Sequence, residues 1–551
     1  MKLKRFLTGL MTTVMMFSVV ACGGSSDEAK KISYNNTHEP PELNSVMTTS
    51  TGSGNVLRHI MEGLVTLDEN DEPEAGVAEK WTVSEDKLTY TFNLRKGTKW
   101  SNGEEVTAKD FKYAWDQLFD ASVGAKYAGT WVPLFKGGEG WGDTTTLPAE
   151  EQAAAQAKVM DAVRENGYKA VDDYTFEVYT SGPYDYMLGV LAFYNFLPMN
   201  EKAVEEAGGW DAYAKEADAM ATNGPFTIDE WIHEDKIVMN KDDNYWQADK
   251  INLDALEFRV ISDINAALSS FEANEIDVIE VTGEQAKQLR EEGKTVNDFD
   301  DGSSWYFEYN TTRTGLKNVK IRKALTLAFD AQLFVNSIVL NESKPATSFV
   351  PTAIQKGEFA SKVGTLIERP TDGNYDAVKA MLEEGLKEEG LALADFKPVM
   401  LVDDTPTGNK TAAFVQEQFK QHLGVELAIE VMTYKARIAR MQSQDFDIVY
   451  AGWGPDYNDP MTFLDLFTTG NGNNHTGYSN ARYDELVGLA RAEVDTDKRT
   501  EYLLELEKII VEDQPIGYIY NRRKDYVMQE GITGVVKTSF TDVDFRFADK
   551  K

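Results

Sequence analysis

The chain has 551 residues, a formal net charge of −35 at pH 7, 42% hydrophobic residues and 11% aromatic residues. This apolar content excludes a wholly disordered chain, and the negative charge argues against nucleic acid or anionic lipid headgroups as partners. The length predicts several folding units. Because Cys22 is the single cysteine, no internal disulfide is possible, and burial of apolar side chains must hold the fold together.

The N-terminus has the pattern of a secretory signal. A basic start precedes an apolar run at residues 7–20, which is shorter than the roughly 20 residues that a membrane-spanning helix needs. Residues 19–22, VVAC, resemble the lipobox of bacterial lipoproteins. The resemblance implies a signal peptide at 1–21, lipidation of Cys22 and a flexible tether at 22–31. The alternative is an ordinary signal peptide with an incidental cysteine.

Alternation of apolar and polar residues predicts the first elements of the mature chain. Residues 88–94 and 174–178 each alternate and are expected to form half-buried strands. Thr107 followed by Asp110 resembles a capping box, with Asp in place of the usual Glu. We therefore expect a helix to begin at Thr107 and to continue through Trp115.

Strand and helix patterns alternate between about residues 306 and 520. Strands are expected at 398–402, 425–431 and 446–450, and helices between them. This order implies a parallel sheet with right-handed crossovers. Ligands of such sheets bind beyond the carboxyl ends of the strands, so residues 451–460 are the first place to expect a site.

Motifs for covalent or metal-dependent chemistry are absent from the sequence. The five histidines show neither metal-ligand spacing nor an HExxH pattern. There is no GxSxG elbow and no phosphate-binding loop. We therefore expect no metal, no cofactor and a binding protein rather than an enzyme. A surface lipoprotein hydrolase that uses a pair of acidic residues stays open as the alternative.

Four segments in order, 54–115, 222–246, 318–330 and 446–467, resemble the oligopeptide-binding proteins of ABC importers, extracytoplasmic solute-binding protein family 5. The resemblance implies an α/β, two-lobed, hinged periplasmic-binding-protein-like fold (type II) with an additional third subdomain. It also implies that peptide is held in extended form between closing lobes. The expected partners are oligopeptides, the permease subunits of an importer in the membrane, and the membrane itself through the lipid anchor. The expected protein is extracytoplasmic and monomeric.

The resemblance also divides the chain into three parts. Lobe I is expected to be discontinuous and to combine residues 32–61, 200–305 and 523–551. The additional subdomain is expected at 62–199 and lobe II at 306–522.

The family motif GW-x-x-D is present as residues 452–456. In the family its aspartate binds the α-ammonium group of the peptide, so the resemblance assigns that role to Asp456. A charged partner is physically reasonable, because enclosing an ammonium group without one costs several kcal/mol. The alternative is a turn-rich loop in which Asp456 only caps its own backbone.

Five further residues join the candidate peptide site through the resemblance. Trp453 is expected to line a side-chain pocket, with core packing as the alternative, and Gly452 and Gly454 to let their backbone approach the peptide. Tyr434 stands where the family often has a pocket tryptophan. Tyr450 stands where Gram-negative members have an arginine that grips the carboxylate of short peptides.

A second departure from the Gram-negative members lies at residues 49–51, where those relatives have an acidic residue near the ligand. Both departures leave the ammonium end of the motif intact. They leave open the preferred peptide length and how the carboxyl end of the ligand is held.

Overall fold

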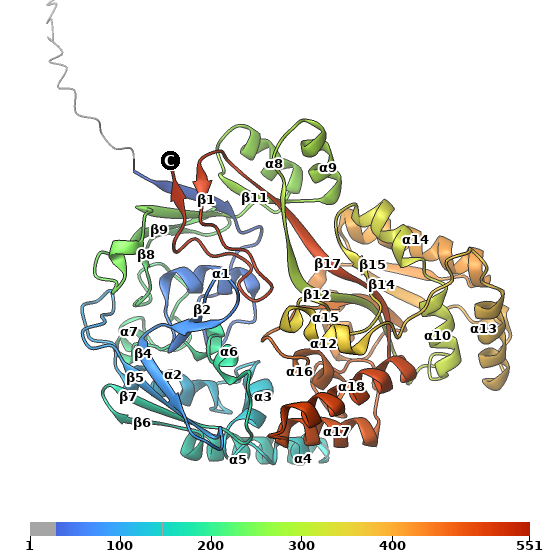
Figure 1. Ribbon diagram of the computed structural model, residues 1–551, viewed down its shortest axis with the longest axis horizontal. Helices are drawn as coiled ribbons and strands as arrows, with labels where there is room; N and C mark the ends of the chain where they lie inside the picture. Colours follow the sequence, from blue (N-terminus) through green and yellow to red (C-terminus); the bar gives the residue numbers. More distant parts are fainter. Residues whose placement is uncertain (1–28, 146) are drawn as a thin grey trace, which may run out of the picture.

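The computed structural model describes residues 29–145 and 147–551 (Figure 1). The predicted signal peptide and Cys22 lie outside the described residues. Within the described ranges, no helix is long and apolar enough to cross a membrane.

The body of the protein begins earlier than the sequence indicates. Lys30 and Lys31, which we expected in the tether, are both part of it. The Lys30 backbone N–H donates to the carboxylate of Asp254 (2.7 Å), and Lys31 is the first residue of strand β1 (Lys31–Asn35). Pairing of β1 with a strand near residue 255 holds this segment in place.

A large mixed sheet runs through the centre of the molecule (Figure 1). Its strands follow the spatial order β15 (Ala428–Met432), β14 (Val399–Asp403), β16 (Ile448–Trp453), β12 (Asn297–Tyr309), β17 (Ile516–Met528), β11 (Val278–Val281), β1, β10 (Ala255–Arg259), β9 (Lys236–Lys241) and β8 (Phe226–Ile232), and β13 (Lys344–Pro345) pairs with β17.

Two long strands join the two halves of this sheet. β12 and β17 are 13 residues each and pair with each other in antiparallel fashion. The register of this pair shifts between Asp300 and Ser304 and again between Trp305 and Tyr306. The lobe boundaries expected after residues 305 and 522 therefore fall inside continuous strands and not in linkers.

The strand and helix alternation predicted for the second half is confirmed. β14 pairs in parallel with both β15 and β16, and α14 (Pro406–Leu423) and α15 (Tyr434–Gln442) connect them. β15 begins at Ala428, three residues later than predicted. The reason is that Val425 closes the end of α14, where its N–H donates to the Phe419 carbonyl (3.1 Å) after a left-handed Gly424.

A smaller antiparallel sheet forms the centre of the subdomain, in the order β4 (Ala78–Val83), β5 (Thr89–Leu94), β7 (Thr175–Tyr179), β6 (Tyr168–Asp172). The two strands and the helix predicted here are confirmed. Helix α2 (Ala108–Leu118) begins where the Asp110 carboxylate accepts from the Thr107 N–H (2.7 Å). Trp115 of α2 is fully buried and meets Phe176 and Phe196 edge-on at 4.9 and 5.1 Å.

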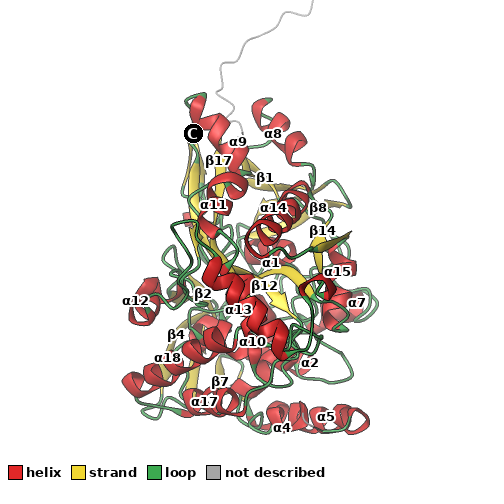
Figure 2. Cartoon of the chain, turned by 90° about the vertical axis from the view of Figure 1, so that its right-hand side faces the viewer, coloured by secondary structure: helices red, strands yellow, loops and turns green. Residues whose placement is uncertain are grey.

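Helices cover both faces of the central sheet. In Figure 2, α10 (Val319–Leu327) and α13 (Asp376–Glu388) pack on each other in front of it. The other helices are α1 (Thr51–Ile60), α3 (Ala128–Trp131), α4 (Trp141–Thr145), α5 (Ala149–Asn166), α6 (Met187–Leu191), α7 (Glu201–Glu206), α8 (Ile264–Glu272), α9 (Gly283–Glu291), α11 (Ala331–Phe334), α12 (Glu358–Val363), α16 (Met461–Leu464), α17 (Ala481–Ala492) and α18 (Thr496–Asp513). The short strands are β2 (Val65–Leu67), β3 (Pro73–Ala75), β18 (Ile532–Thr533) and β19 (Asp549–Lys550).

Helix α18 carries a carboxyl group into the core. Leu506, Glu507 and Ile510 are all fully buried on one face of this helix. The Glu507 carboxylate accepts hydrogen bonds from the backbone N–H groups of Phe349 and Val350. Burial nevertheless raises the pKa of Glu507 to about 7, because desolvation disfavours the charged form.

Replacing Glu507 with Gln should flatten the pH dependence of stability. A carboxyl group with a raised folded pKa stabilises the fold below its unfolded pKa, and this contribution is lost as pH rises through about 7. The shift from 4.5 to about 7 corresponds to a loss on the order of 3 kcal/mol. Between pH 5 and pH 8 the melting temperature of Glu507→Gln should fall less than that of wild type in calorimetric scans. Parallel curves for the two proteins would show that folding does not raise the pKa of Glu507.

Candidate functional site

A cavity of about 1400 Å³ lies where the subdomain, the central sheet and the C-terminal segment meet. Its walls come from the α3 region, the chain after α6, the loop that follows β16, residues 468–475 and residues 538–542. Pockets for single small molecules usually enclose 300–1000 Å³. The cavity is therefore large enough for a ligand of several residues.

The GW-x-x-D segment leaves the carboxyl end of β16 and forms part of this wall. Gly452, Trp453, Gly454 and Asp456 all line the cavity. A side chain at Gly452 would lie 2.8 Å from the ring of Trp305, its partner on β12. The close approach of Trp305 thus requires glycine at position 452, a reason that the sequence pattern did not reveal.

The carboxyl group of Asp456 is largely enclosed by protein atoms and has no cationic partner among the described residues. Some of its surface stays accessible from the cavity, although protein atoms surround the group on the other sides. Burial first, and then the negative charge of Asp465, raise the pKa of Asp456 to about 7. Among the described residues, one hydrogen bond reaches its side chain, from the Tyr127 hydroxyl at 3.4 Å. No Lys, Arg or His of the described ranges forms an ion pair with it.

The neighbouring acid, not Asp456, caps this loop. The Asp459 carboxylate accepts from the Met461 backbone N–H (3.0 Å), whereas in the described part of the chain no backbone N–H donates to the Asp456 carboxylate. Asp456 is instead positioned through its own backbone, which donates to the Thr462 hydroxyl (3.0 Å). Its carboxylate is therefore left for contacts across the cavity.

Aromatic rings surround this carboxyl group. Tyr127 and Tyr194 line the cavity, and burial first, followed by the charge of Asp456, raises the pKa of both phenols. The rings of Phe193 and Tyr194 stack at 4.1 Å. Such a wall excludes water, so a charge placed against Asp456 interacts more strongly than it would in solvent.

Two tryptophan N–H groups in the cavity wall have no acceptor. The Nε1 atoms of Trp453 and Trp305 are buried and make no hydrogen bond with any described residue. Buried donors are rarely left unsatisfied in native proteins. Because both atoms are buried, a ligand could reach them only if the two side chains moved.

The structure places one of the other predicted residues, Tyr450, outside the cavity wall. Tyr450 does not line the cavity; it is buried against Trp305 at 5.0 Å, and its hydroxyl lies 3.4 Å from that of Tyr520. Tyr434 is the first residue of α15, and its side chain lies outside the described part of the structure. Thr49 and Thr51, from the segment without the acidic residue, do line the cavity.

Several charged cavity residues had no signal in the sequence. Asp465 pairs with Arg491 (2.7 Å) close to Asp456. Lys524 of β17 also lines the cavity and pairs with Asp542 (3.1 Å). These partners are 26 and 18 positions apart in the chain, and only the tertiary fold brings them together.

A further polar pair lies on β12 and the loop after α16. The Glu308 Oε2 and His475 Nδ1 atoms are 3.4 Å apart, line the same cavity and lack hydrogen bonds in the described structure. Alternation along a strand could have indicated that Glu308 points inward, but it could not have indicated that His475 lies beside it.

Known proteins match this chain over almost its whole length. The sequence model for bacterial extracellular solute-binding proteins, family 5 Middle, matches residues 72–475. The oligopeptide-binding protein OppA of Bacillus subtilis is 34% identical over 98% of this chain and 98% of its own. The structure of Listeria monocytogenes OppA bound to peptide is 30% identical, with a TM-score of 0.80 over 95% of this chain and 99% of that one.

A structure of the murein tripeptide-binding protein MppA in its unliganded open form gives a TM-score of only 0.69 at 24% identity, over 95% of this chain and 98% of that one. The family model, which matches most of the chain, and the Bacillus relative together establish the family of this protein. The chain belongs to the bacterial extracellular solute-binding proteins, family 5.

Proposed function

We propose that this protein captures oligopeptides between two closing lobes and delivers them to the permease of an ABC importer. The observation that carries the proposal is the Asp456 carboxyl group, which faces a large cavity at the end of β16 without a cationic partner. The Bacillus and Listeria relatives, both named for peptides, support the same ligand class.

Asp456 would bind the α-ammonium group of the peptide. A carboxylate enclosed by aromatic rings gains most from a partner that supplies both a positive charge and hydrogen-bond donors. The peptide main chain would then run along the end of β16, where Gly452 and Gly454 line the cavity. Backbone recognition of this kind tolerates different side chains.

The lobes would move about β12 and β17. We propose lobe I as residues 32–61, 200–305 and 523–551, the subdomain as 62–199 and lobe II as 306–522, in a monomeric receptor. Both boundaries between the lobes fall at register shifts within the β12–β17 pair. Irregular pairing is a suitable place for a hinge, because a few residues there can absorb the change in backbone angles.

The ammonium role of Asp456 can be tested by a double-mutant-style cycle. Asp456→Asn keeps the shape and removes the charge, and N-acetylation of the peptide removes the opposite charge. Each change should cost about 3–5 kcal/mol, a few hundred- to a few thousandfold in affinity, and the two losses should not add. Calorimetry with tetra- to hexapeptides measures all four combinations. Additive losses, or unchanged binding by the Asn variant, would remove Asp456 from the site.

The same titrations distinguish a receptor from the alternative hydrolase. Peptide recovered from the wild-type complex should be intact by mass spectrometry after prolonged incubation. Catalytic loss of peptide would favour the enzyme.

Peptide affinity should depend on pH through Asp456. With a ligand-free pKa of about 7, the carboxyl group must release its proton before it can pair with an ammonium group. Affinity should therefore rise up to tenfold per pH unit from pH 5 to pH 7 and fall again above pH 8, where the peptide amine loses its proton. Calorimetry in buffers of different ionisation enthalpy should detect proton release at pH 6. In Asp456→Asn the rise below pH 7 should disappear, and its persistence would assign it to another group.

Lipidation at Cys22 is proposed from the signal pattern alone. Cys22→Ala should release the protein from the membrane and leave peptide affinity in solution unchanged, because the anchor precedes the folded body. Membrane fractionation and calorimetry test the two halves of this expectation. A variant that is still cleaved and still membrane-bound would contradict the lipobox interpretation.

A further inference from the structure

We propose that Tyr186 and Arg499 are positioning residues that hold the loop of Asp456 against the subdomain and thereby stabilise the closed cleft. This inference rests on the proposed function of the same site. Its starting point is that each of the three residues after Asp456 is restrained by a different neighbour. Together these contacts fix the loop that carries the carboxyl group.

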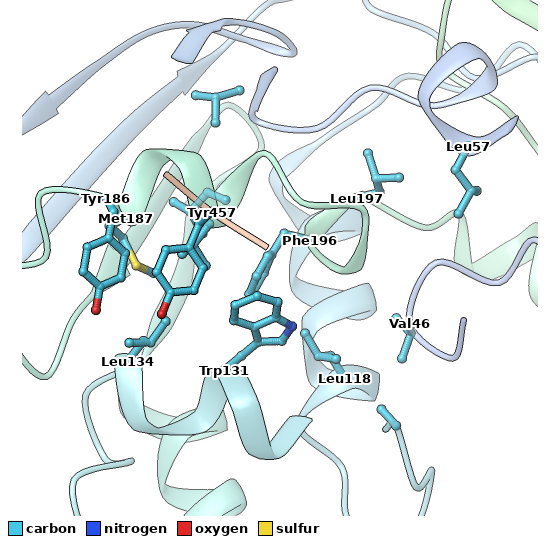
Figure 3. Packing of buried hydrophobic residues seen from close by; sticks show 14 of the residues in the cluster. Val46, Leu57, Leu118, Trp131, Leu134, Tyr186, Met187, Phe196, Leu197 and Tyr457 are labelled. Carbon is cyan, nitrogen blue, oxygen red and sulfur yellow. The ribbon is translucent and has the colours of Figure 1, made fainter. Parts of the chain in front are cut away.

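Tyr457 is held by a ring stack across the cleft. Its ring lies parallel to that of Tyr186, with centroids 4.7 Å apart and planes 13° apart, and Trp131 approaches its other side at 6.5 Å (Figure 3). Tyr186 and Trp131 belong to the subdomain, whereas Tyr457 follows β16. Both tyrosines are buried, so the stack excludes water at the place where the two parts meet.

Asp459 is held by an arginine that also contacts this stack. The Arg499 guanidinium donates to both carboxylate oxygens of Asp459, at 2.8 and 2.7 Å. The same guanidinium lies 5.4 Å from the ring centroid of Tyr186, within the range of a cation–π contact. Arg499 thus joins the loop on one side to the subdomain ring on the other.

Asn458 is held by a turn with unfavourable backbone angles. A side chain of the same turn also contacts the subdomain. The Asn458 side-chain oxygen accepts from the Gln355 backbone N–H (2.7 Å). Gln355 and Lys356 both have left-handed backbone angles, with φ of 50° and 53°, which cost energy for residues with a side chain. Lys356 then pairs with Glu72 (2.9 Å), but both side chains are more than half exposed, so that pair contributes little.

Neither Tyr186 nor Arg499 lines the cavity. Both residues can therefore influence the ligand only through the loop and through the equilibrium between open and closed forms. A contact made only in the closed form raises the population that binds peptide, and it raises the affinity for every peptide by the same factor. Release should accelerate when the contact is lost, since cleft opening must precede it.

The test compares Tyr186→Leu with Tyr186→Phe, which keeps the ring, and with Lys356→Gln as a matched control for an exposed contact between the same two parts. Tyr457 is unsuitable because it also lines the cavity. Affinity, stoichiometry and peptide release rate are measured with three peptides of different length and side chains.

Tyr186→Leu should bind all three peptides about tenfold more weakly, equivalent to about 1.4 kcal/mol, with full stoichiometry and a correspondingly faster release. Tyr186→Phe should stay within about twofold of wild type, and so should Lys356→Gln. If Tyr186→Leu folds poorly, Arg499→Lys supplies the second variant, since it keeps the charge and loses the two-pronged grip on Asp459; the same uniform loss is expected.

Unchanged release from both Tyr186→Leu and Arg499→Lys would overturn the inference. So would a loss that depends on the side chains of the peptide, because that would indicate direct contact. A wild-type protein that binds none of the peptides would instead overturn the proposed function. The two failures are therefore distinguishable in one set of measurements.

Discussion

A carboxyl group that is enclosed by protein and lacks a cationic partner is the constraint on which the site depends. Desolvation and the nearby charge of Asp465 raise the pKa of Asp456 to about 7, so its ionised form is poorly stabilised until a cation arrives. The protein carries many paired carboxylates, such as Asp459 with Arg499 and Asp542 with Lys524. Asp456 differs from them because none of the described residues supplies a cationic partner for it. An ammonium group is the simplest ligand that completes the pairing.

The central sheet places this carboxyl group where the parts of the molecule meet. β16 ends at Trp453, beside the long strand β12, so the loop that follows projects toward the subdomain. β12 and β17 connect the two halves without a break, which keeps both walls of the cavity in one continuous framework. Movement about such strands can bring Tyr127 and Tyr186 to the loop, or remove them, without unfolding either half.

The contacts around the loop differ greatly in their expected contribution. Buried rings and a two-pronged arginine pair are worth more than an exposed lysine–glutamate pair, because solvent weakens the attraction between exposed charges. The same comparison explains how a receptor can remain closed around different peptides. Contacts between the protein's own residues stabilise the closed form equally, whichever peptide is bound. The ligand needs to supply only the remaining free energy of closure.

Much of the local structure could be predicted from the sequence. Alternation identified the strands at β5 and β7, the Thr107–Asp110 pair identified the start of α2, and the strand–helix order identified the parallel strands β14, β15 and β16. These signals depend on neighbours within a few positions, which is why they can be read from the chain. The segment that reaches the cavity, GW-x-x-D, was also found by its pattern.

Tertiary structure decided which distant residues contact the segments that the sequence predicts. The ring of Trp305 explains Gly452, the core position of Tyr450 removes it from the cavity wall, and Tyr186 and Arg499 join the loop from distant parts of the chain. The pKa of Asp456 likewise depends on Tyr127 and Asp465, which the sequence does not connect to it. The amino-acid sequence by itself thus determined the elements and the family motif, because their signals are local. Packing between distant segments decided the neighbours and the charge state of the site, because desolvation and ring contacts arise only when those segments meet.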